Sequence, residues 1–405
     1  MSERDLHTRC CIAGGGPAGI MLGYLLARAG IDVVILEKWP DFFRDFRGDT
    51  IHPSTMEVLA ELGLLEDFLK LPHNEMTRMT FHAGNEEVTV ADLSHLKVHC
   101  PFIAFMPQWD FLNFLSGRAK EYSNFHLLMA TEAIDLIEEN GGVVGVRAKD
   151  STGEFNIHAD LVVGADGRHS VIREKGGFAV KKLGVPIDVL WFRIAKTDMD
   201  DQQSLGYLGL GGGLIMLDRH DYWQCALIIK KNSFETVKAA GLETFRHSVA
   251  ALARLSDSAF KEVDSWDKVK LLSVTVDHVE QWAKPGVLLI GDAAHAMSPI
   301  GGVGINYAIQ DAVSAGNTLI PAFHKGRPEM EILKKIQARR SPPVLKMQRL
   351  QVLIQNHILS PFLERSNGSK KVVWFMRLFR FLPFIRRIPS RVIGIGFLPE
   401  HIETV

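Results

Sequence analysis

Apolar and polar positions alternate in blocks at the start of the chain. Residues 10–13 form an apolar run that is too short for a helix and therefore predicts a buried strand. Residues 18–29 have the spacing of a buried helix, and Gly30 follows where glycine commonly ends one. A second apolar run, 33–36, ends at Glu37. This order predicts the opening strand–helix–strand unit of a parallel sheet.

The same reasoning extends this lobe along the chain. Proline is common in the first turn of a helix, so Pro53 predicts a helix to Gly63, and Pro107 predicts another. Further runs between loop residues predict strands at 125–129, 133–138, 143–148 and 156–163. The apolar run 287–290 predicts one more buried strand, followed by a glycine-rich turn and a helix over 304–319.

Between residues 180 and 279 the pattern changes to short β-rich runs around one helix near 234–255. We interpret this region as a second, antiparallel lobe and assign residues 79–90 to it as well. Its expected strands lie at 189–195, 213–217, 223–229 and 271–276.

These elements predict an α/β fold in which an antiparallel β-sheet domain is inserted into a Rossmann-like nucleotide-binding domain, with a helical C-terminal region. The discontinuous first domain is expected at 1–76, 100–179 and 277–325. The inserted domain is expected at 77–99 and 180–276, and the helical region at 326–405.

Composition narrows the function classes. The 405 residues are 46% hydrophobic and 23% charged, which is typical of a globular protein. A net charge of −1 argues against nucleic acid as a partner. The chain has four cysteines but no C-x-x-C pair, no apolar signal segment and no apolar run of membrane length. These features favour a cytoplasmic protein. No cluster has metal-ligand spacing, so no metal is expected.

The segment between Glu364 and Glu400 has no carboxylate but eight lysines and arginines mixed with aromatic residues. Two interpretations stay open. It is either a terminal helical segment that packs on the body or on a second copy, or a surface for peripheral contact with an anionic membrane. A monomer and a homodimer are both compatible with the sequence.

Gly14-Gly15-Gly16-Pro17-Ala18-Gly19 has the dinucleotide fingerprint between a predicted strand and a predicted helix. Its glycines permit the tight turn, close approach to a pyrophosphate and helix–strand packing. Glu37, at the end of the second strand, is placed to accept hydrogen bonds from ribose hydroxyls, and Lys38 is assigned to the same site.

A second strand-to-helix turn, Gly291-Asp292-Ala293-Ala294-His295, lies nearly 280 residues away. Helix starts present free N–H groups and a positive dipole end to anions. The two turns together predict one long cofactor held at both ends, with a pyrophosphate at the first turn and a redox ring near the second.

Three further segments carry a resemblance to the class A flavoprotein aromatic hydroxylases, which extends over roughly residues 8–320. Residues 161–173 resemble the family's Asp-Gly motif, and residues 288–295 with 299–306 resemble its Gly-Asp motif and flavin loop. Arg47-Gly48-Asp49 resembles an arginine-containing contact to FAD.

The resemblance implies that FAD is the cofactor and that Asp292 accepts a ribityl hydroxyl. It places Arg47 and Gln108 against FAD, and it gives Asp166 and Gly167 a double role toward FAD and a transient NADH or NADPH. His169 falls where some members contact the pyridine nucleotide, and His295 is expected to be structural. The residues expected near the flavin ring are Pro299, Gly302, Gly304, Ile305 and Asn306.

The implied activity is an NAD(P)H-dependent FAD monooxygenase that hydroxylates a small aromatic or polyketide/quinone-like substrate through a flavin C4a-hydroperoxide. The protein then supplies positioning and exclusion of water, so no catalytic residue is assigned. The substrate is expected against the antiparallel sheet. Polar candidates there are His82, Arg193, Tyr207, Tyr222 and Gln224.

Three other protein classes share parts of this pattern. A flavin-dependent halogenase usually carries Trp-x-Trp, and no two of the seven tryptophans are spaced two apart. A flavin-dependent reductase or desaturase that acts on isoprenoid chains would share the opening fingerprint, but the segments at Arg47 and 299–306 fit hydroxylases better. A non-catalytic carrier with the same fold would not need an intact Gly-Asp loop, and it would purify without the colour of a flavin.

Overall fold

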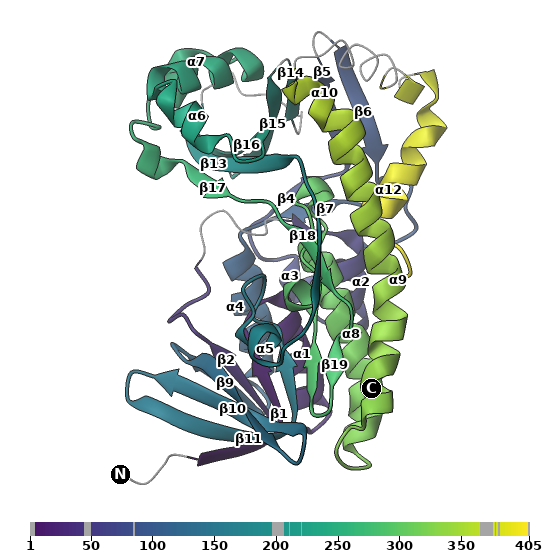
Figure 1. The fold of residues 1–405 in the computed structure, drawn as a ribbon. Coiled ribbons are helices and arrows are strands. Elements are labelled where there is room, and N and C mark those ends of the chain that lie inside the picture. Colours follow the sequence, from purple (N-terminus) through teal and green to yellow (C-terminus); the bar gives the residue numbers. More distant parts are fainter. Residues whose placement is uncertain are drawn as a thin grey trace.

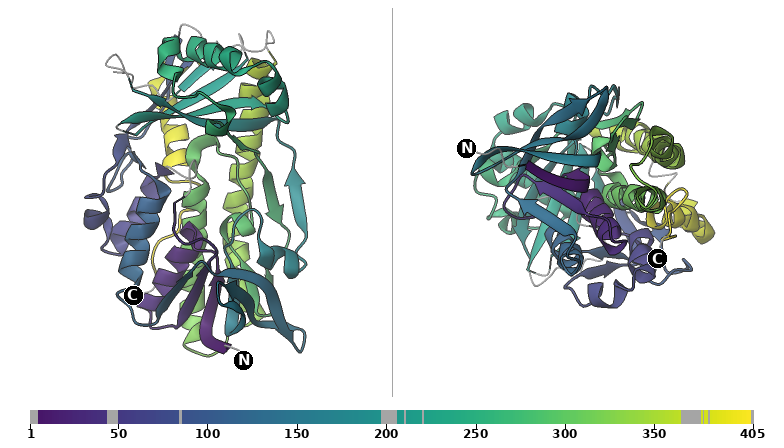
Figure 2. Two further views of the ribbon diagram at one scale, coloured as in Figure 1. Left: turned by 90° about the vertical axis from the view of Figure 1, so that its left-hand side faces the viewer. Right: turned by 90° about the horizontal axis from the view of Figure 1, so that it is seen from below.

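The computed structural model describes residues 5–43, 50–83, 86–196, 206–209, 211–219, 221–364, 376, 378–379 and 381–403. Two large sheets lie at opposite ends of an elongated molecule, and helices α8 and α9 run along one side between them (Figures 1 and 2). The mixed α/β fold is the one predicted. The domain boundaries remain an interpretation.

The first sheet has a parallel centre. Strand β1 (Asp5–Ala13) pairs in parallel with β2 (Val33–Glu37) on one side and β11 (Gly153–Gly164) on the other. β8 (Phe125–Met129) and β20 (Val287–Leu289) extend it in parallel. Antiparallel additions are β9 (Glu132–Glu139), β10 (Gly142–Asp150) and β19 (Ala283–Lys284). Every strand predicted for this lobe is confirmed, including the late return of residues 287–290.

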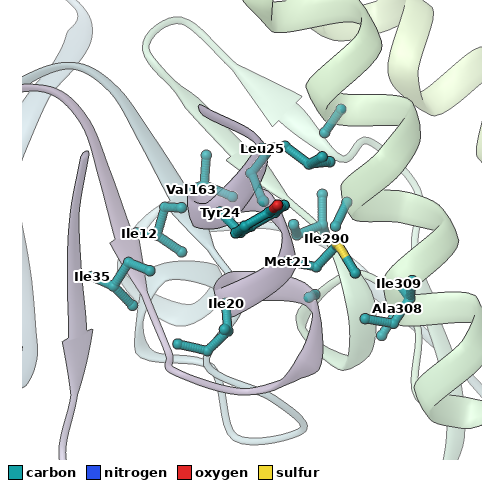
Figure 3. Close-up of a cluster of buried hydrophobic side chains, with 14 of the residues drawn as sticks. Ile12, Ile20, Met21, Tyr24, Leu25, Ile35, Val163, Ile290, Ala308 and Ile309 are labelled. Atoms are coloured by element: carbon teal, nitrogen blue, oxygen red, sulfur yellow. The ribbon is translucent and has the colours of Figure 1, made fainter. Parts of the chain in front are cut away.

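Helix α1 (Pro17–Arg28) lies between this sheet and α8 (Gly304–Phe323), as Figure 3 shows. Met21 and Leu25 of α1 and Ile309 of α8 are fully or almost fully buried in the same core. Gly23 lets α1 approach the sheet, because a Cβ there would lie 2.4 Å from Ile35. The other helices of this lobe are α2 (Pro53–Glu61), α3 (Leu65–Phe68), α4 (Gln108–Ala119) and α5 (Val171–Lys175).

The second sheet has seven strands in the order β17-β13-β16-β15-β14-β5-β6. Its strands are β5 (Arg78–Ala83), β6 (Glu86–Asp92), β13 (Ile187–Ala195), β14 (Gly206–Gly209), β15 (Gly212–Asp218), β16 (Tyr222–Lys230) and β17 (Lys270–Leu272). The assignment of residues 79–90 to this sheet is confirmed. Helices α6 (Phe234–Ala239) and α7 (Leu242–Ala253) cover its outer face (Figure 1).

Two predicted elements are divided in the structure. The single helix expected over 234–255 breaks at Gly241, whose φ is +92°. The strand expected at 271–276 separates into β17 and β18 (Val276–Val279), and β18 pairs with β12 (Val180–Leu183). Buried Asp188 accepts the Val274 N–H at 3.0 Å, which draws the chain out of the ladder between them.

A small three-stranded sheet joins β3 (Thr50–Ile51), β7 (Ile103–Phe105) and β4 (Asn74–Met76). Short 3₁₀ turns include η3 (Gly291–Ala293), η4 (Ile300–Gly302) and η6 (Pro383–Arg386), with two more at Asp257–Phe260 and Trp266–Lys268. None of the described helices is long and apolar enough to cross a membrane.

The described part of the tail after Gly326 is mostly helical, as predicted. α9 (Met330–Ile354) continues through a π-helical turn (Gln355–Leu359) into α10 (Ser360–Leu363), and α12 (Arg387–Gly394) follows later. We call residues 387–403 the C-terminal strap. It contacts the body through Ser390, whose hydroxyl donates to the Asp92 carbonyl at 2.7 Å, and through Glu400, which pairs with Arg339 at 2.8 Å.

Candidate functional site

The first turn has the geometry that its glycines predict. Gly14 has φ +106°, and a Cβ there would lie 2.3 Å from the Ala165 carbonyl oxygen. A Cβ at Gly19 would lie 2.0 Å from the Gly14 carbonyl oxygen. Gly14 therefore fits against the end of β11, and Gly19 seats α1 on the turn.

Gly16 differs from Gly14 and Gly19 because no neighbouring atom of the protein would prevent a side chain there. It is the N-cap of α1, its φ of −75° is ordinary, and a Cβ there would meet no atom within 4 Å. Pro17 follows as the first helical residue. The start of α1 thus leaves open space over its backbone, which fits a bound pyrophosphate.

Glu37 lies beside this turn, where the fingerprint places it. Its Oε2 accepts the Gly15 N–H at 3.0 Å and its Oε1 accepts the Trp39 N–H at 3.1 Å. These bonds hold the carboxylate at the end of β2. Lys38 places its ammonium 5.5 Å from the centre of the Trp39 ring.

The second turn meets the first. Gly291 has φ +60°, and a Cβ there would lie 3.2 Å from Ala18 Cβ and 3.4 Å from Ala308 Cβ. Ala18 belongs to the first turn of α1, and Ala308 lies near the start of α8. Residues near the starts of two helices that are far apart in sequence therefore pack against the same glycine, an arrangement that lets one long cofactor reach both.

Asp292 forms an ion pair that the sequence analysis did not predict. Its Oδ2 lies 3.2 Å from Arg168 Nε, and both side chains are about one-third exposed. Arg173 adds a second link, since its guanidinium donates to the Ala293 carbonyl at 3.1 Å and to the Arg168 carbonyl. The Asp-Gly and Gly-Asp segments are thereby held together. The basic residue directly after Asp166-Gly167 was the only available signal for this contact.

Asp166 caps the short helix α5. Its Oδ2 accepts the N–H groups of Val171 at 2.7 Å and Ile172 at 3.2 Å. Burial raises its pKa, and the hydrogen bonds it accepts oppose that rise. Its Oδ1 is buried and has no hydrogen-bond partner among the described residues. One acceptor therefore remains for a ligand hydroxyl. Gly167 beside it has φ +83°, and His169 is exposed.

The flavin-loop residues contact α2 and the strap. Asn306 Oδ1 accepts the His52 N–H at 2.9 Å and the Thr55 hydroxyl at 2.7 Å. Thr50 donates its hydroxyl to the Gly302 carbonyl at 2.8 Å. His52 is fully buried, burial lowers its pKa to about 4, and its Nδ1 lies 2.7 Å from the Ile393 carbonyl oxygen.

These contacts limit how the predicted loop residues could touch a flavin. The side chains of Asn306 and Ile305 are buried in the protein, so contact through these residues would come from the main chain. Pro299 precedes η4, and Gly304 opens α8 with no atom within 4 Å of a built Cβ. Gly302 has φ +64°, and a Cβ there would lie 2.6 Å from Thr50 Oγ1, so glycine lets the loop pack closely against β3.

Behind the second turn lies a buried charge cluster, which we define as His295, Asp311, Arg340 and Glu400. Asp311 accepts the Gly291 N–H at 3.0 Å and contacts His295 Nε2 at 2.5 Å and Arg340 Nε at 2.9 Å. Arg340 NH1 lies 3.3 Å from Glu400 Oε1. All four residues are almost completely buried. His295 is therefore a structural residue, as expected.

The inner face of the second sheet approaches the flavin loop. Trp191 and Ile215 pack in one apolar cluster with Ile300 of η4, and in a second cluster with Leu217 and Ile393. In the strand register, Arg193 pairs with Gln224, and Gln224 pairs with Leu217, so these residues share that face. Arg193 also lies 4.8 Å from the Tyr222 ring centre.

Two of the predicted substrate candidates lie on the wrong face. Tyr207 packs in the cluster beneath α7, and His82 stacks on it with ring centres 5.1 Å apart. Strand side chains alternate between faces, so neighbouring positions in β5 and β14 point to opposite sides. The expectation for His82 and Tyr207 is therefore wrong, whereas Arg193, Tyr222 and Gln224 lie on the expected face.

The other two predicted FAD contacts are Gln108 and Arg47. Gln108 is the first residue of α4, as expected, after Pro107. Asp110 in the same turn has a pKa raised by burial, and the charge of Arg219 opposes this rise. The start of α4 thus approaches the second sheet. Arg47 lies outside the described residues. Within the described parts of the chain, no three His, Cys, Asp or Glu side chains form a metal-binding group.

Comparison with known proteins agrees with this geometry. Residues 7–350 match the family model described as FAD binding domain. The chain is 30% identical over 358 residues to 6-methylpretetramide 4-monooxygenase from Streptomyces rimosus, covering 87% of this chain and 85% of that protein. OxyS anhydrotetracycline hydroxylase from Streptomyces rimosus has a similar structure, with a TM-score of 0.75 at 23% identity over 96% of this chain and 76% of that one.

A second similar structure is that of p-nitrophenol 4-monooxygenase PnpA from Pseudomonas putida DLL-E4. Its TM-score is 0.73 at 18% identity, over 93% of this chain and 98% of that one. At these identities the structural likenesses establish the fold.

Proposed function

Because the chain belongs to the FAD-binding-domain family of FAD-dependent aromatic monooxygenases, we propose that it uses NADH or NADPH to hydroxylate a flat, fused-ring phenolic substrate. The meeting of the α1 and α8 starts at Gly291 is the structural observation that supports this function best.

The residues at the two turns fit FAD. The open backbone at Gly16 would hold the pyrophosphate, and Glu37 would hold the adenosine ribose. Asp292 would accept a hydrogen bond from a ribityl hydroxyl, either in place of its ion pair with Arg168 or in addition to it. Asp166 Oδ1, which has no partner among the described residues, could accept another hydrogen bond. The loop 299–306 would border the flavin ring through its main chain, with Gln108 and Arg47 as further proposed contacts.

When bound, FAD supplies the redox chemistry, accepting a hydride from NAD(P)H and activating O₂. The chain's own contribution is electrostatic and steric. The positive end of the α8 dipole favours negative charge on a group at its start. The apolar residues Ile300, Trp191 and Ile215 keep water away from that place. Neither contribution needs a protein acid or base.

The substrate class follows from the inner face of the second sheet. Trp191 and Ile215 present flat and aliphatic surface toward Ile300, and Leu217 adjoins them, which favours burial of an aromatic ring system. Gln224, which is 5% exposed and accepts a hydrogen bond from Arg219 at 3.1 Å, adds polar groups at one side. By their names, two of the similar proteins act on 6-methylpretetramide and anhydrotetracycline, which supports a polyketide-derived substrate.

We also place the protein in the cytoplasm. Its four cysteines, Cys10, Cys11, Cys100 and Cys225, are all free and buried. Such thiols are typical of proteins that work in a reducing compartment.

The proposed cofactor contacts are tested with Asp292→Ala. We expect at least a tenfold weaker retention of FAD, measured as the ratio of flavin to protein absorbance after gel filtration, because a charge-assisted hydrogen bond is worth roughly 1.5–3 kcal/mol. Asp264→Ala is the matched control, since it removes the exposed ion pair with Lys268 far from the site. Full FAD occupancy in Asp292→Ala would disprove the assigned role of this carboxylate.

The substrate class is tested with wild-type enzyme. Three- and four-ring phenols should stimulate NAD(P)H oxidation coupled to hydroxylated product, and single-ring phenols should give a kcat/KM at least tenfold lower. Product analysis is required because uncoupled oxidation forms only peroxide. Equal kcat/KM for both groups would contradict the proposed substrate class while leaving the monooxygenase activity intact.

A further inference from the structure

Large apolar side chains are exposed on α12 and in the residues just before it. Phe381, Phe384 and Ile388 are 73%, 64% and 66% exposed, respectively. Arg387 and Arg391 are exposed beside them. We call these five residues the basic apolar surface. Scattered apolar residues are ordinary on a protein surface, but three so exposed within eight positions mark an interaction site.

This surface is held in a defined orientation. The opposite side of α12 packs on the body, where a Cβ at Gly394 would lie 2.9 Å from Leu96 and the Ser390 hydroxyl donates to Asp92. Positions 384, 387, 388 and 391 are spaced three to four residues apart, so they share the outward side. Figure 1 shows α12 beside β6, at the edge of the second sheet.

Along the chain, the charged residues around this surface are all basic. The sequence has no carboxylate between Glu364 and Glu400. On the adjoining loop, His95 and Lys97 are exposed. The neighbouring strand β6 carries Glu86, Glu87 and Asp92, and the Asp92 carboxylate accepts the Ser94 N–H at 3.1 Å and the Ser94 hydroxyl at 2.6 Å. An occupant of this surface must therefore tolerate both exposed aromatic groups and a cluster of arginines.

We propose that the basic apolar surface docks on an anionic lipid bilayer. Phenylalanine and isoleucine can enter the boundary between headgroups and acyl chains while arginines bind the anionic headgroups. A second copy of the chain is a poorer occupant, because a twofold contact through this surface would place Arg387 and Arg391 against their own counterparts. The docking is independent of the substrate proposed above.

The test is co-sedimentation of the full-length, FAD-loaded protein with vesicles. We expect binding to vesicles of phosphatidylcholine with phosphatidylglycerol and little binding to phosphatidylcholine alone. Each basic side chain near an anionic surface contributes about 1 kcal/mol, so R387Q/R391Q should lower the partition coefficient about 30-fold at low salt. F384S/I388S should lower it as well, because apolar burial is lost.

The matched control is K181Q/K182Q, which removes two exposed charges from β12 and should leave binding unchanged. Absence of binding to anionic vesicles, or equal losses in the control and in R387Q/R391Q, would overturn the proposal. A wild-type dimer in analytical ultracentrifugation that F384S/I388S dissociates would also overturn it and assign the surface to a second copy. NAD(P)H oxidation without vesicles should be the same in all variants, which separates this test from that of the proposed function.

Discussion

Replacement of Arg340 by methionine tests how the buried charge cluster supports the second turn. Arg340 is 1% exposed and contacts Asp311 at 2.9 Å and Glu400 at 3.3 Å. Methionine preserves helix propensity and much of the volume but removes the guanidinium. Two buried carboxylates then lose their shared cation, while Asp311 keeps its contacts with His295 and the Gly291 N–H.

Loss of one partner of a buried ion pair costs roughly 3–5 kcal/mol, because it leaves an uncompensated buried charge. With a slope of roughly 3 kcal/mol per molar urea, the unfolding midpoint should fall by about 1–1.7 M at pH 7. Arg339→Met is the matched control on the neighbouring residue. Its side chain is 54% exposed in its pair with Glu400, so its removal should cost less than about 1 kcal/mol.

The pH dependence gives a second readout. Burial alone raises the pKa of Asp311, but His295 and Arg340 outweigh it and hold the pKa below its ordinary value. A carboxyl with a lowered folded-state pKa adds stability above its unfolded pKa, and this stability is lost as the pH falls through the folded value. Without Arg340 the carboxyl protonates more easily, so the difference between Arg340→Met and wild type should shrink as the pH falls below about 5.

Urea titrations followed by circular dichroism at pH 7 and pH 4.5 measure both effects. A loss below about 1 kcal/mol at pH 7, or an equal loss in Arg339→Met, would refute the reasoning. A stability difference between Arg340→Met and wild type that is larger at pH 4.5 than at pH 7 would refute it as well.

Two further predictions concern the turn glycines and His52. Gly16→Val should keep the thermal stability of the protein but abolish FAD retention, because the new Cβ meets no atom within 4 Å yet covers the open backbone. Gly19→Val should lose both stability and FAD retention, because its Cβ would lie 2.0 Å from the Gly14 carbonyl oxygen. Melting curves and flavin absorbance distinguish them, and FAD retained in Gly16→Val would contradict the pyrophosphate assignment. Unfolded histidine takes up a proton near pH 6.5, whereas His52 in the folded protein does so only at a pKa of about 4. Protonation of the unfolded chain should therefore remove about 1.6 kcal/mol of stability between pH 6.5 and 5. His52→Asn should flatten this slope in urea midpoints, and an unchanged slope would show that another group titrates.

The sequence was sufficient where the signal is local. Gly14, Gly16 and Gly19 occur at a spacing that is typical of a strand-to-helix turn, between a predicted strand and a predicted helix, and the structure forms that turn. Fold class, parallel strands and cofactor could be predicted for this reason. By contrast, Asp311, Arg340 and Glu400 form one cluster although 29 and 60 residues separate them. No local pattern identifies partners that distant.

The substrate face shows a different limit. Whether a strand side chain points to α7 or to the flavin loop changes with every residue, and a polar residue in a strand does not reveal its side. His82 and Tyr207 were chosen because they are polar, but they lie beneath α7. Trp191 and Ile215 were overlooked because an apolar side chain that lines a site has the same sequence signal as one in a core.

The strap also sets an order of events during biosynthesis. Glu400 reaches Arg340, and through it Asp311 and the Gly291 N–H, only after the preceding residues have been translated. At about 5–20 residues per second, β1 is synthesised roughly 20–80 s before that residue is added. The packing behind the Gly291 turn is therefore completed long after the glycine turn between β1 and α1 has been synthesised.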